Sequence, residues 1–221
     1  MPLPRFRNLE PARRDRLFEA AGSEFAERGF EGASVNRILD RAGLSKGVLY
    51  YYFEDKADLF ATTLERAVEH LFEASGLPSG EASLEAWVEG LDARGFWDGL
   101  REMSRQSVRL LRADRWYVRL ARSYHRIRQE PDGAVLTDRV EDVGRRMLEA
   151  LLTRGRALGV VRTDLPLDFL VDCTLAFDHA ADRWVLERLE RLDDPALAAH
   201  MEARMDLLRD MLGGRNEGGG R

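Results

Sequence analysis

The sequence predicts an all-α protein, and three observations support that prediction. Apolar residues recur at three- and four-residue spacing along almost every segment, which is the period of a helix with one buried face. Alternating runs of β-branched residues, the pattern of half-buried strands, are missing. Glycine, proline and capping residues divide the chain into pieces of helical length.

The N-terminal region begins with a long helix followed by a short one. We expect the first helix over about residues 9–28, with Gly29 as its C-terminal stop. Ser34 is placed to cap a short helix that runs through Arg41, and Gly43 breaks the helical pattern after it.

Two further helices complete this region. Ser45 is expected to cap a second short helix that ends near Tyr52. Asp55, with Asp58 three residues later, resembles a capping box that opens a longer helix to about Ala74.

A linker and a longer helical region follow. Residues 75–80 have the composition of a linker, so we place the boundary there, between a domain of residues 9–74 and one of residues 75–212. The helices of the second domain are expected over about residues 84–113 with a break near 94–95, 114–129, 133–158, 166–192, and from 195 onward. The glycine-rich tail, residues 213–221, is expected to be disordered.

Residues 34–53 form one unit of a capped helix, a tight turn around Gly43 and a second capped helix. This order and spacing define a helix-turn-helix, in which one helix crosses the DNA phosphates and the next places its N-terminal residues against base edges. Apolar side chains should lock the angle between the two helices, namely Ile38, Leu39, Leu44, Leu49 and Phe53.

The second helix of this unit has an unusual composition. Three successive tyrosines, residues 50–52, cannot all be buried on a short helix, so at least two should expose their hydroxyl groups. Gly47 lowers helix propensity by roughly 1 kcal/mol relative to alanine. That disadvantage makes sense if the backbone approaches a phosphate or a base closely.

Several stretches of this region match one known pattern. They are Phe25-Ala26-Glu27-Arg28-Gly29-Phe30, Ser34-Val35 with Ile38, Ala42-Gly43-Leu44-Ser45-Lys46-Gly47, Leu49-Tyr50-Tyr51-Tyr52-Phe53, and Lys56 with Leu59. With these residues, the chain from about Arg13 to Leu71 resembles the DNA-binding domain of the TetR family of bacterial regulators. The resemblance implies an Ω-shaped, all-helical homodimer with a small N-terminal DNA reader. It also implies a larger C-terminal domain that binds an effector and dimerises through its last two long helices.

The resemblance also implies DNA contacts for individual residues. These are phosphate contacts from Ser34, Ser45 and Lys56, base contacts from Lys46 and Gly47, and contacts of Tyr50 and Tyr52 with the DNA backbone. The sequence departs from the family at Leu39, where a small residue is common, and at Asn36-Arg37, where Arg37 offers a further phosphate contact. The alternatives are ordinary solvated lysines at positions 46 and 56 and a half-buried aromatic seam for the tyrosines.

The second domain is rich in aromatic residues and has surplus apolar surface on its last two helices. The residues expected to line an effector site are Trp87, Trp97, Trp116, Tyr117, Tyr124, His125 and Phe177, with core packing as the alternative for each. The residues expected at a dimer interface are Leu170, Phe177, Val185, Leu197, Met201, Met205 and Leu208. The sequence leaves the chemistry of the effector open.

Composition narrows the function classes. The formal net charge is −5, and residues 1–60 carry ten Arg or Lys against ten Asp or Glu, so total charge gives no support to DNA binding. A single cysteine excludes an internal disulfide, and no secretory signal or membrane span is visible, so we expect a cytoplasmic protein. The chain has no Gly-rich phosphate loop, nucleophile elbow or paired His/Glu ligands, so we expect no enzyme, metal or cofactor.

The function that follows is a DNA-binding repressor that an unidentified small-molecule effector releases from a palindromic operator. The alternatives are a transcriptional activator and a ligand-independent DNA-binding dimer. An all-helical enzyme with an added helix-turn-helix finds no support in the motifs.

Overall fold

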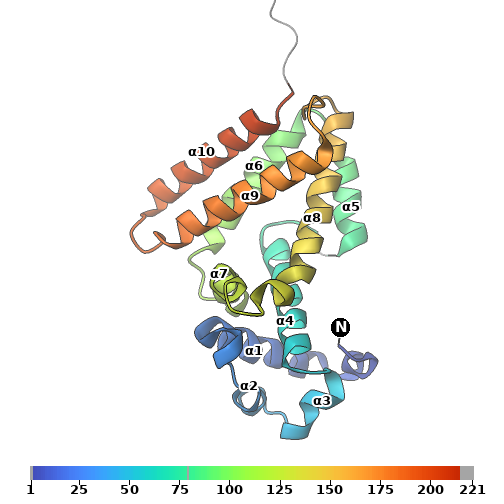
Figure 1. The fold of residues 1–221 in the computed structure, drawn as a ribbon, viewed down its shortest axis with the longest axis vertical. Helices are drawn as coiled ribbons and strands as arrows, with labels where there is room; N and C mark the ends of the chain where they lie inside the picture. Colours follow the sequence, from blue (N-terminus) through green and yellow to red (C-terminus); the bar gives the residue numbers. More distant parts are fainter. Residues whose placement is uncertain (1, 79, 215–221) are drawn as a thin grey trace, which may run out of the picture. The chain divides into compact units, whose positions relative to one another are not determined.

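The computed structural model describes residues 2–78 and 80–214, without the side chains of Lys46 and Glu81. Its regular elements are helices, apart from one isolated β-bridge between Val161 and Gly213 within that described part (Figure 1). The prediction of an all-α protein is therefore confirmed. The described residues divide into two compact units. Unit 1 comprises the residues up to Phe72 together with Leu111–Asp142, and unit 2 comprises Glu73–Leu110 together with the residues from Val143 on.

Unit 1 contains the helix-turn-helix and two later helical segments. Its elements are η1 (Pro4–Asn8), α1 (Pro11–Gly32), α2 (Val35–Ala42), η2 (Lys46–Val48), α3 (Leu49–Tyr52), most of α4 (Lys56–Ala74), α7 (Trp116–Arg128) and the beginning of α8 (Gly133–Ala157). Its core joins side chains from all these helical segments, among them Phe25, Ile38, Phe53, Phe60, Leu120 and Leu136.

The ends of α1 and α2 follow from local chemistry. Gly29 leaves helical geometry with φ 72°, as expected of a stop, but helical turns resume and α1 ends at Gly32 instead. Ser34 caps α2 because its hydroxyl accepts a hydrogen bond from the backbone nitrogen of Arg37 at 3.4 Å. Gly43 ends α2 in the left-handed region, with φ 68°, which glycine adopts without strain. Both predictions for α2 are confirmed.

The recognition segment starts differently from the prediction. The side chain of Ser45 makes no capping hydrogen bond, and residues 46–48 form a 3-10 turn before α3 begins. The physical reason is a backbone bond, since the nitrogen of Val48 donates to the carbonyl of Ser45 at 3.0 Å and closes the turn by itself.

The start of α4 is close to a capping box. Oδ1 of Asp55 accepts a hydrogen bond from the backbone nitrogen of Asp58 at 2.8 Å, as predicted. The carboxylate of Asp58 reaches back to the nitrogen of Glu54 at 3.3 Å, one residue before the position that a capping box uses.

α7 packs closely against α1. A Cβ on Gly22 would lie 2.3 Å from an atom of the Trp116 ring, so only glycine permits this approach. Arg119 of α7 donates a hydrogen bond to the hydroxyl of Ser23 at 2.9 Å. By packing, α7 and the beginning of α8 therefore belong with the N-terminal helices, whereas the functional boundary predicted at residue 74 stays a prediction.

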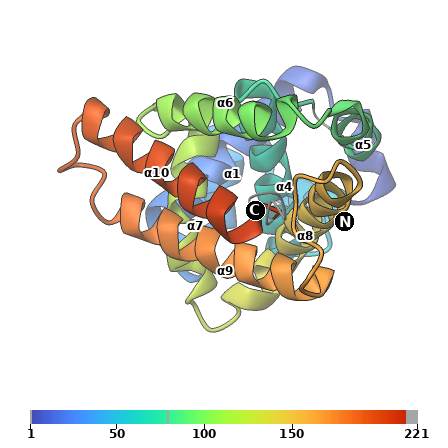
Figure 2. The same ribbon diagram turned by 90° about the horizontal axis from the view of Figure 1, so that it is seen from above.

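Unit 2 is a helical layer with its own core. Its elements are α5 (Glu81–Gly90), α6 (Gly95–Leu110), the remainder of α8, α9 (Leu167–Leu186) and α10 (Asp194–Leu212). Figure 2 shows α10 lying between α6 and α9. Arg204 of α10 holds α9 through Asp178 at 2.8 Å and Asp182 at 2.6 Å. On the other side, Arg101 of α6 pairs with Glu202 at 2.5 Å.

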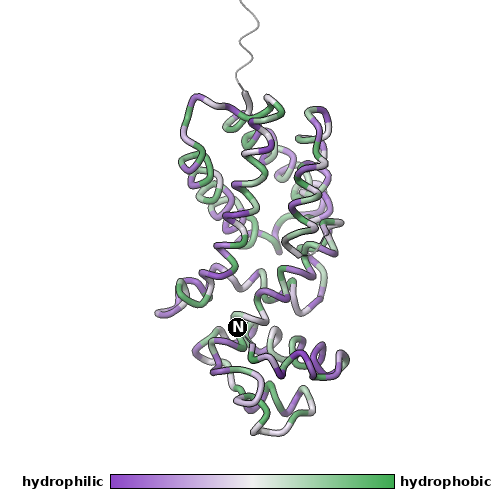
Figure 3. Tube along the Cα trace, turned by 90° about the vertical axis from the view of Figure 1, so that its right-hand side faces the viewer, coloured by the Kyte–Doolittle hydropathy of each residue, from purple (hydrophilic) through white to green (hydrophobic). Residues whose placement is uncertain are grey.

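Hydrophilic and hydrophobic stretches alternate along the helices (Figure 3). Within residues 2–78 and 80–214, no helix is long and apolar enough to cross a membrane. Of the predicted C-terminal tail, Gly213 donates a backbone hydrogen bond to the carbonyl of Arg209 at 2.7 Å. Residues 215–221 of that tail lie outside the described residues.

Candidate nucleic-acid interface

Apolar side chains lock the helix-turn-helix from beneath. Ile38 and Leu39 of α2 are buried, and so are Leu49 of α3 and Phe53 after it. Leu44, in the turn, is half-buried against the same core. The predicted lock is confirmed, and it fixes the angle between α2 and α3 before any partner binds.

The opposite face of α3 presents tyrosines. Tyr50 exposes 72% of its surface and Tyr51 exposes 49%, which confirms that at least two of the three are accessible. Tyr52 is half-buried, with its ring 5.8 Å from that of Phe6 in an edge-to-face contact. The guanidinium of Arg5 lies 4.7 Å from the ring centre of Tyr51, a contact that the sequence reasoning missed.

Gly47 lies at the exposed start of the recognition segment. No atom lies within 4 Å of the position that a Cβ would take there, and Gly47 is not among the residues with positive φ. The rest of the described chain therefore gives no reason for glycine at this position. Ser45, two residues earlier, is also exposed, and the side chain of Lys46 lies outside the described part.

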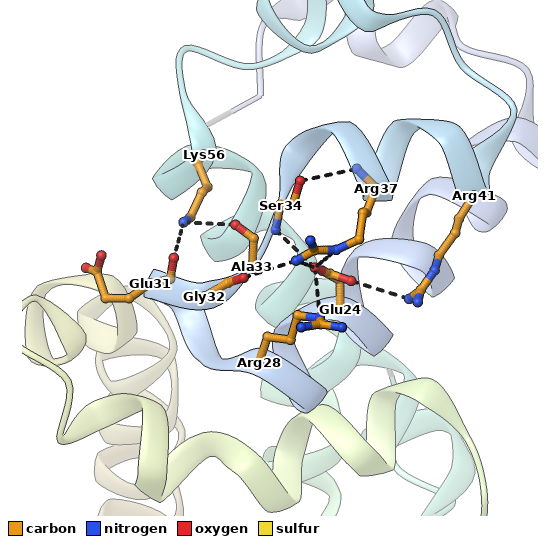
Figure 4. Close-up of polar contacts among 9 residues, drawn as sticks. All are labelled: Glu24, Arg28, Glu31, Gly32, Ala33, Ser34, Arg37, Arg41 and Lys56. Carbon is orange, nitrogen blue, oxygen red and sulfur yellow. Dashed lines mark hydrogen bonds and ion pairs between the residues drawn. The ribbon is translucent and has the colours of Figure 1, made fainter.

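A buried carboxylate organises the start of α2 (Figure 4). Glu24 of α1 is fully buried, and its Oε1 accepts a hydrogen bond from the backbone nitrogen of Ser34 at 3.0 Å. Arg37 donates to the same oxygen from Nε at 2.7 Å, and its Nη2 donates to the carbonyl of Gly32 at 3.2 Å. The arginine predicted to contact a phosphate is thus bound to Glu24 in the absence of DNA.

Two more arginines border this carboxylate. Nε of Arg28 lies 3.5 Å from Oε1 of Glu24, and Nη1 of Arg41 lies 3.4 Å from Oε2. Burial raises the pKa of Glu24, but the hydrogen bonds from Arg37 and from the nitrogen of Ser34, with the charges of Arg37 and Arg28, outweigh burial and lower the pKa below its usual value. The carboxylate is therefore charged at neutral pH.

The sequence reasoning did not include Glu24. A signal for it exists, because Glu24 follows Leu17 by seven residues and Ala21 by three, which places it on the apolar stripe of α1. A carboxylate at such a position needs partners, because burying an unpaired charge is costly.

Lys56 occupies the end of α1 and the turn that follows. Its ammonium donates to the carbonyls of Glu31 and Ala33 at 3.2 Å each and lies 4.5 Å from the ring centre of Phe30. Two of its three donors are thus used within the chain.

The aromatic residues predicted to line an effector site belong to both units. Unit 1 holds Trp116, Tyr117, Tyr124 and His125, whereas unit 2 holds Trp87, Trp97 and Phe177. In unit 1, the ring of His70 stacks on that of Tyr117 at 5.3 Å. The hydroxyl of Tyr124 donates to Glu141, and burial together with this carboxylate raises the pKa of Tyr124. Trp97 is buried in the core of unit 2.

Most of the residues predicted at a dimer interface point into their own unit. Those that are buried are Leu170, Val185, Leu197, Met201 and Met205, and those that are half-buried are Phe177 and Leu208. The exposed apolar side chains of the same helices are Phe169 at 51%, Trp184 at 39% and Leu207 at 59%. Sequence periodicity did not single out Trp184 or Leu207.

Comparison with known proteins gives a consistent result. The sequence model of "Bacterial regulatory proteins, tetR family" matches residues 17–63, which include Glu24 and the helix-turn-helix. The HTH-type transcriptional repressor SCO4008 of Streptomyces coelicolor is 30% identical over 139 residues, covering 58% of this chain and 70% of that protein. The HTH-type transcriptional activator FasR of Mycolicibacterium smegmatis is 44% identical over 59 residues, which cover only 27% of each chain.

A solved structure shows the same fold over most of the chain. It is the transcriptional regulator FadR from Bacillus subtilis, in complex with stearoyl-CoA, which superposes with a TM-score of 0.67. The match covers 89% of this chain and 98% of that one at 16% identity.

Proposed function

Because the chain belongs to the TetR family of bacterial regulatory proteins and is a transcriptional regulator rather than an enzyme, we propose that it is a repressor that an effector releases from DNA. Its homodimer binds a palindromic operator, with two recognition segments roughly 34–36 Å apart, one helical turn of DNA. A small molecule then favours a conformation in which that spacing is lost.

The observation that carries the proposal is the exposed face of the recognition segment. Tyr50 and the bare backbone at Gly47 are accessible, while Leu49 and Phe53 hold the same segment on the core. A hydroxyl that reaches a phosphate and a backbone that approaches a base edge are what DNA recognition by a helix-turn-helix requires. Ser34, Arg37, Ser45, Lys46, Tyr52 and Lys56 complete the proposed contact set.

Dimerisation through α9 and α10 follows from their exposed apolar side chains. Phe169, Trp184 and Leu207 are large apolar groups that a monomer would leave in water. They replace the buried members of the predicted interface as the groups that meet a partner, with Phe177 and Leu208 beside them. A second copy of the chain covers both helices.

Release by an effector requires that the ligand bind one conformation more tightly than the other. The aromatic residues of both units, together with His70, are the candidate ligand contacts. Long-chain acyl-CoA is the first ligand to test, because the FadR structure from Bacillus subtilis contains stearoyl-CoA.

Activation is the second candidate function, because one relative that matches the N-terminal region is named an activator. A ligand-independent dimer is the third. A reporter gene placed behind the operator separates the first two, since deletion of the regulator raises expression under a repressor and lowers it under an activator. A compound library that leaves DNA affinity unchanged would favour the third.

The first experiment is a fluorescence anisotropy titration of the purified chain against a labelled duplex from its own upstream promoter, at two salt concentrations. Scrambled duplex serves as competitor. We expect specific, salt-sensitive binding by two protomers per site. Binding to no sequence in a random duplex library would contradict the proposal.

Tyr50→Phe tests the contact set without disturbing the fold, because the hydroxyl lies on an exposed side chain. Loss of one hydrogen bond to a phosphate should weaken operator binding by about tenfold. Tyr51→Phe, on the neighbouring exposed tyrosine, is the matched control and should leave affinity unchanged. Lys46→Ala should weaken binding and also reduce its salt dependence.

A further inference from the structure

We infer that Glu24 holds Arg28, Arg37 and Arg41 together as a binding patch for backbone phosphates of the operator, beside the helix-turn-helix. The inference rests on the proposed DNA binding and adds a site to it. The arginines of this patch are not all on the recognition segment, since Arg28 belongs to α1 and the other two belong to α2.

The geometry of the patch is that of one buried anion beneath three accessible cations (Figure 4). The side chain of Glu24 has no exposed surface, whereas those of Arg28, Arg37 and Arg41 expose 50%, 44% and 46%. The carboxylate therefore fixes each guanidinium from the protein side and leaves its other side to solvent. Water cannot compete for the carboxylate, because Glu24 is fully buried.

The charges do not balance within the patch. One carboxylate faces three guanidinium groups, so an excess of two positive charges remains among these four side chains. One arginine would suffice to pair Glu24, and like charges held close together repel one another. A phosphate group that joins the patch removes that repulsion, and guanidinium groups bind phosphate oxygens in a fixed fork geometry.

The position of the patch fits a DNA backbone. Arg37 and Arg41 follow Ser34 by three and seven residues, so the three share one face of α2. Ser34 is a proposed phosphate contact, and Lys56 is bound to the carbonyl of Ala33 next to it. Cationic groups therefore continue from the proposed phosphate contact toward the turn that leads to α3.

The arginines are held in place before DNA arrives. Arg37 is fixed by Glu24 and by the carbonyl of Gly32, so two of its three guanidinium nitrogens are engaged. A side chain ordered in advance loses less entropy when it binds. Glu24 is thus a positioning residue, and the arginines are the groups that touch DNA.

Two variants, Arg28→Gln and Arg41→Gln, test the patch. Each removes one cation that is half exposed, so the chain should fold as before. For each, the slope of log Kd against log salt should fall by about 0.9 for one lost phosphate contact, with about tenfold weaker operator binding. Arg209→Gln on α10, also an exposed arginine, is the matched control for the change in net charge and should leave the slope unchanged.

Glu24→Gln tests the positioning role by the direction of the effect. It makes the chain more positive by one charge, so long-range electrostatics alone predict tighter DNA binding. Loss of the anchor for Arg37 predicts weaker operator binding instead. Circular dichroism at the assay temperature establishes that the variant is folded, and if it is not, the two arginine variants decide the matter.

The outcomes separate this inference from the proposed function. If the unaltered chain binds no duplex, the proposed function fails. If it binds its operator but Arg28→Gln and Arg41→Gln have the same slope as Arg209→Gln, the phosphate patch is wrong and the proposed function stands. Tighter operator binding by folded Glu24→Gln would overturn the positioning role.

Discussion

The carboxylate of Glu130 accepts a hydrogen bond from the backbone nitrogen of Phe30, 2.9 Å away and 100 residues earlier in the chain. The same oxygen accepts from the nitrogen of Glu31 at 3.1 Å. The break at Gly29 explains why these nitrogens need an outside acceptor, because a residue with φ 72° interrupts the helical ladder just before them. The turn between α7 and α8 is therefore fixed to the segment that leads into α2.

Glu130→Ala should lower the stability of the protein by about 1–3 kcal/mol, since it leaves two backbone donors without their charged acceptor. Urea unfolding followed by circular dichroism measures the change. Glu130→Gln keeps an acceptor oxygen and should cost less. If alanine and glutamine at position 130 leave the unfolding midpoint where it is, the carboxylate does not hold this segment.

Glu130 also shows what the sequence could not predict. Ser34 and Gly43 were assigned correctly because a cap depends on residues within one turn of it. The partners of Glu130 lie 99 and 100 residues away, and no local pattern brings them together. Glu24 is intermediate, since its place on an apolar stripe was readable but its arginine partners were not.

The apolar stripes of α9 and α10 illustrate a second limit. Periodicity identified both helices as having surplus apolar surface, but it does not say which stripe faces the protomer's own core. Leu170 and Leu197 fill that core at 1% exposure each, while Leu207 remains exposed. The distinction depends on how α6 and α8 cover these helices, which is a property of the tertiary fold.

A pair of glycine variants separates a functional glycine from a structural one. Gly47→Ala should leave stability unchanged or raise it by up to about 1 kcal/mol, because the new Cβ meets no atom within 4 Å and glycine is entropically costly in a helical turn. Operator binding should weaken by about tenfold, or 1.4 kcal/mol, because the methyl group blocks close approach to DNA.

Gly22→Ala is the matched comparison. Its Cβ would lie 2.3 Å from the Trp116 ring, so stability should fall by about 1–3 kcal/mol from overpacking. Thermal unfolding and the anisotropy titration measure both quantities for both variants. Unchanged DNA affinity in Gly47→Ala would mean that the backbone there does not approach DNA.

The proposed dimer face can be tested with one charge. Leu207→Glu places a carboxylate on α10 at a side chain that is 59% exposed in the protomer, so its own fold should tolerate the change. In an apolar dimer interface the same charge would be desolvated, and the dimer dissociation constant should rise at least about tenfold. Analytical ultracentrifugation measures this directly.

Val135→Glu is the control for that experiment, because Val135 is an equally apolar side chain, 74% exposed, on the part of α8 in unit 1. It should remain dimeric. If both variants dimerise as well as the unaltered chain does, the partner contacts a surface other than the one around Leu207.

The lowered pKa of Glu24 predicts how acid affects stability. Burial acts to raise the pKa, but Arg37, the nitrogen of Ser34 and Arg28 bring it below the ordinary value of 4.5. An unfolded chain then binds the proton more readily than the folded one, so this carboxylate stabilises the fold fully above pH 4.5. Its contribution is lost as the pH falls from 4.5 through the folded-state pKa.

Glu24→Gln isolates that contribution from the other acidic residues. At neutral pH the variant should be less stable than the unaltered chain by about 1–3 kcal/mol, because the arginines and the nitrogen of Ser34 lose a charged acceptor. The difference should shrink toward about pH 3, where protonation removes the same charge from Glu24. Urea unfolding at a series of pH values gives the difference at each pH. A difference that stayed constant across the series would mean that the carboxylate is uncharged in the folded protein at neutral pH, since only a charged group can lose this stabilisation on protonation.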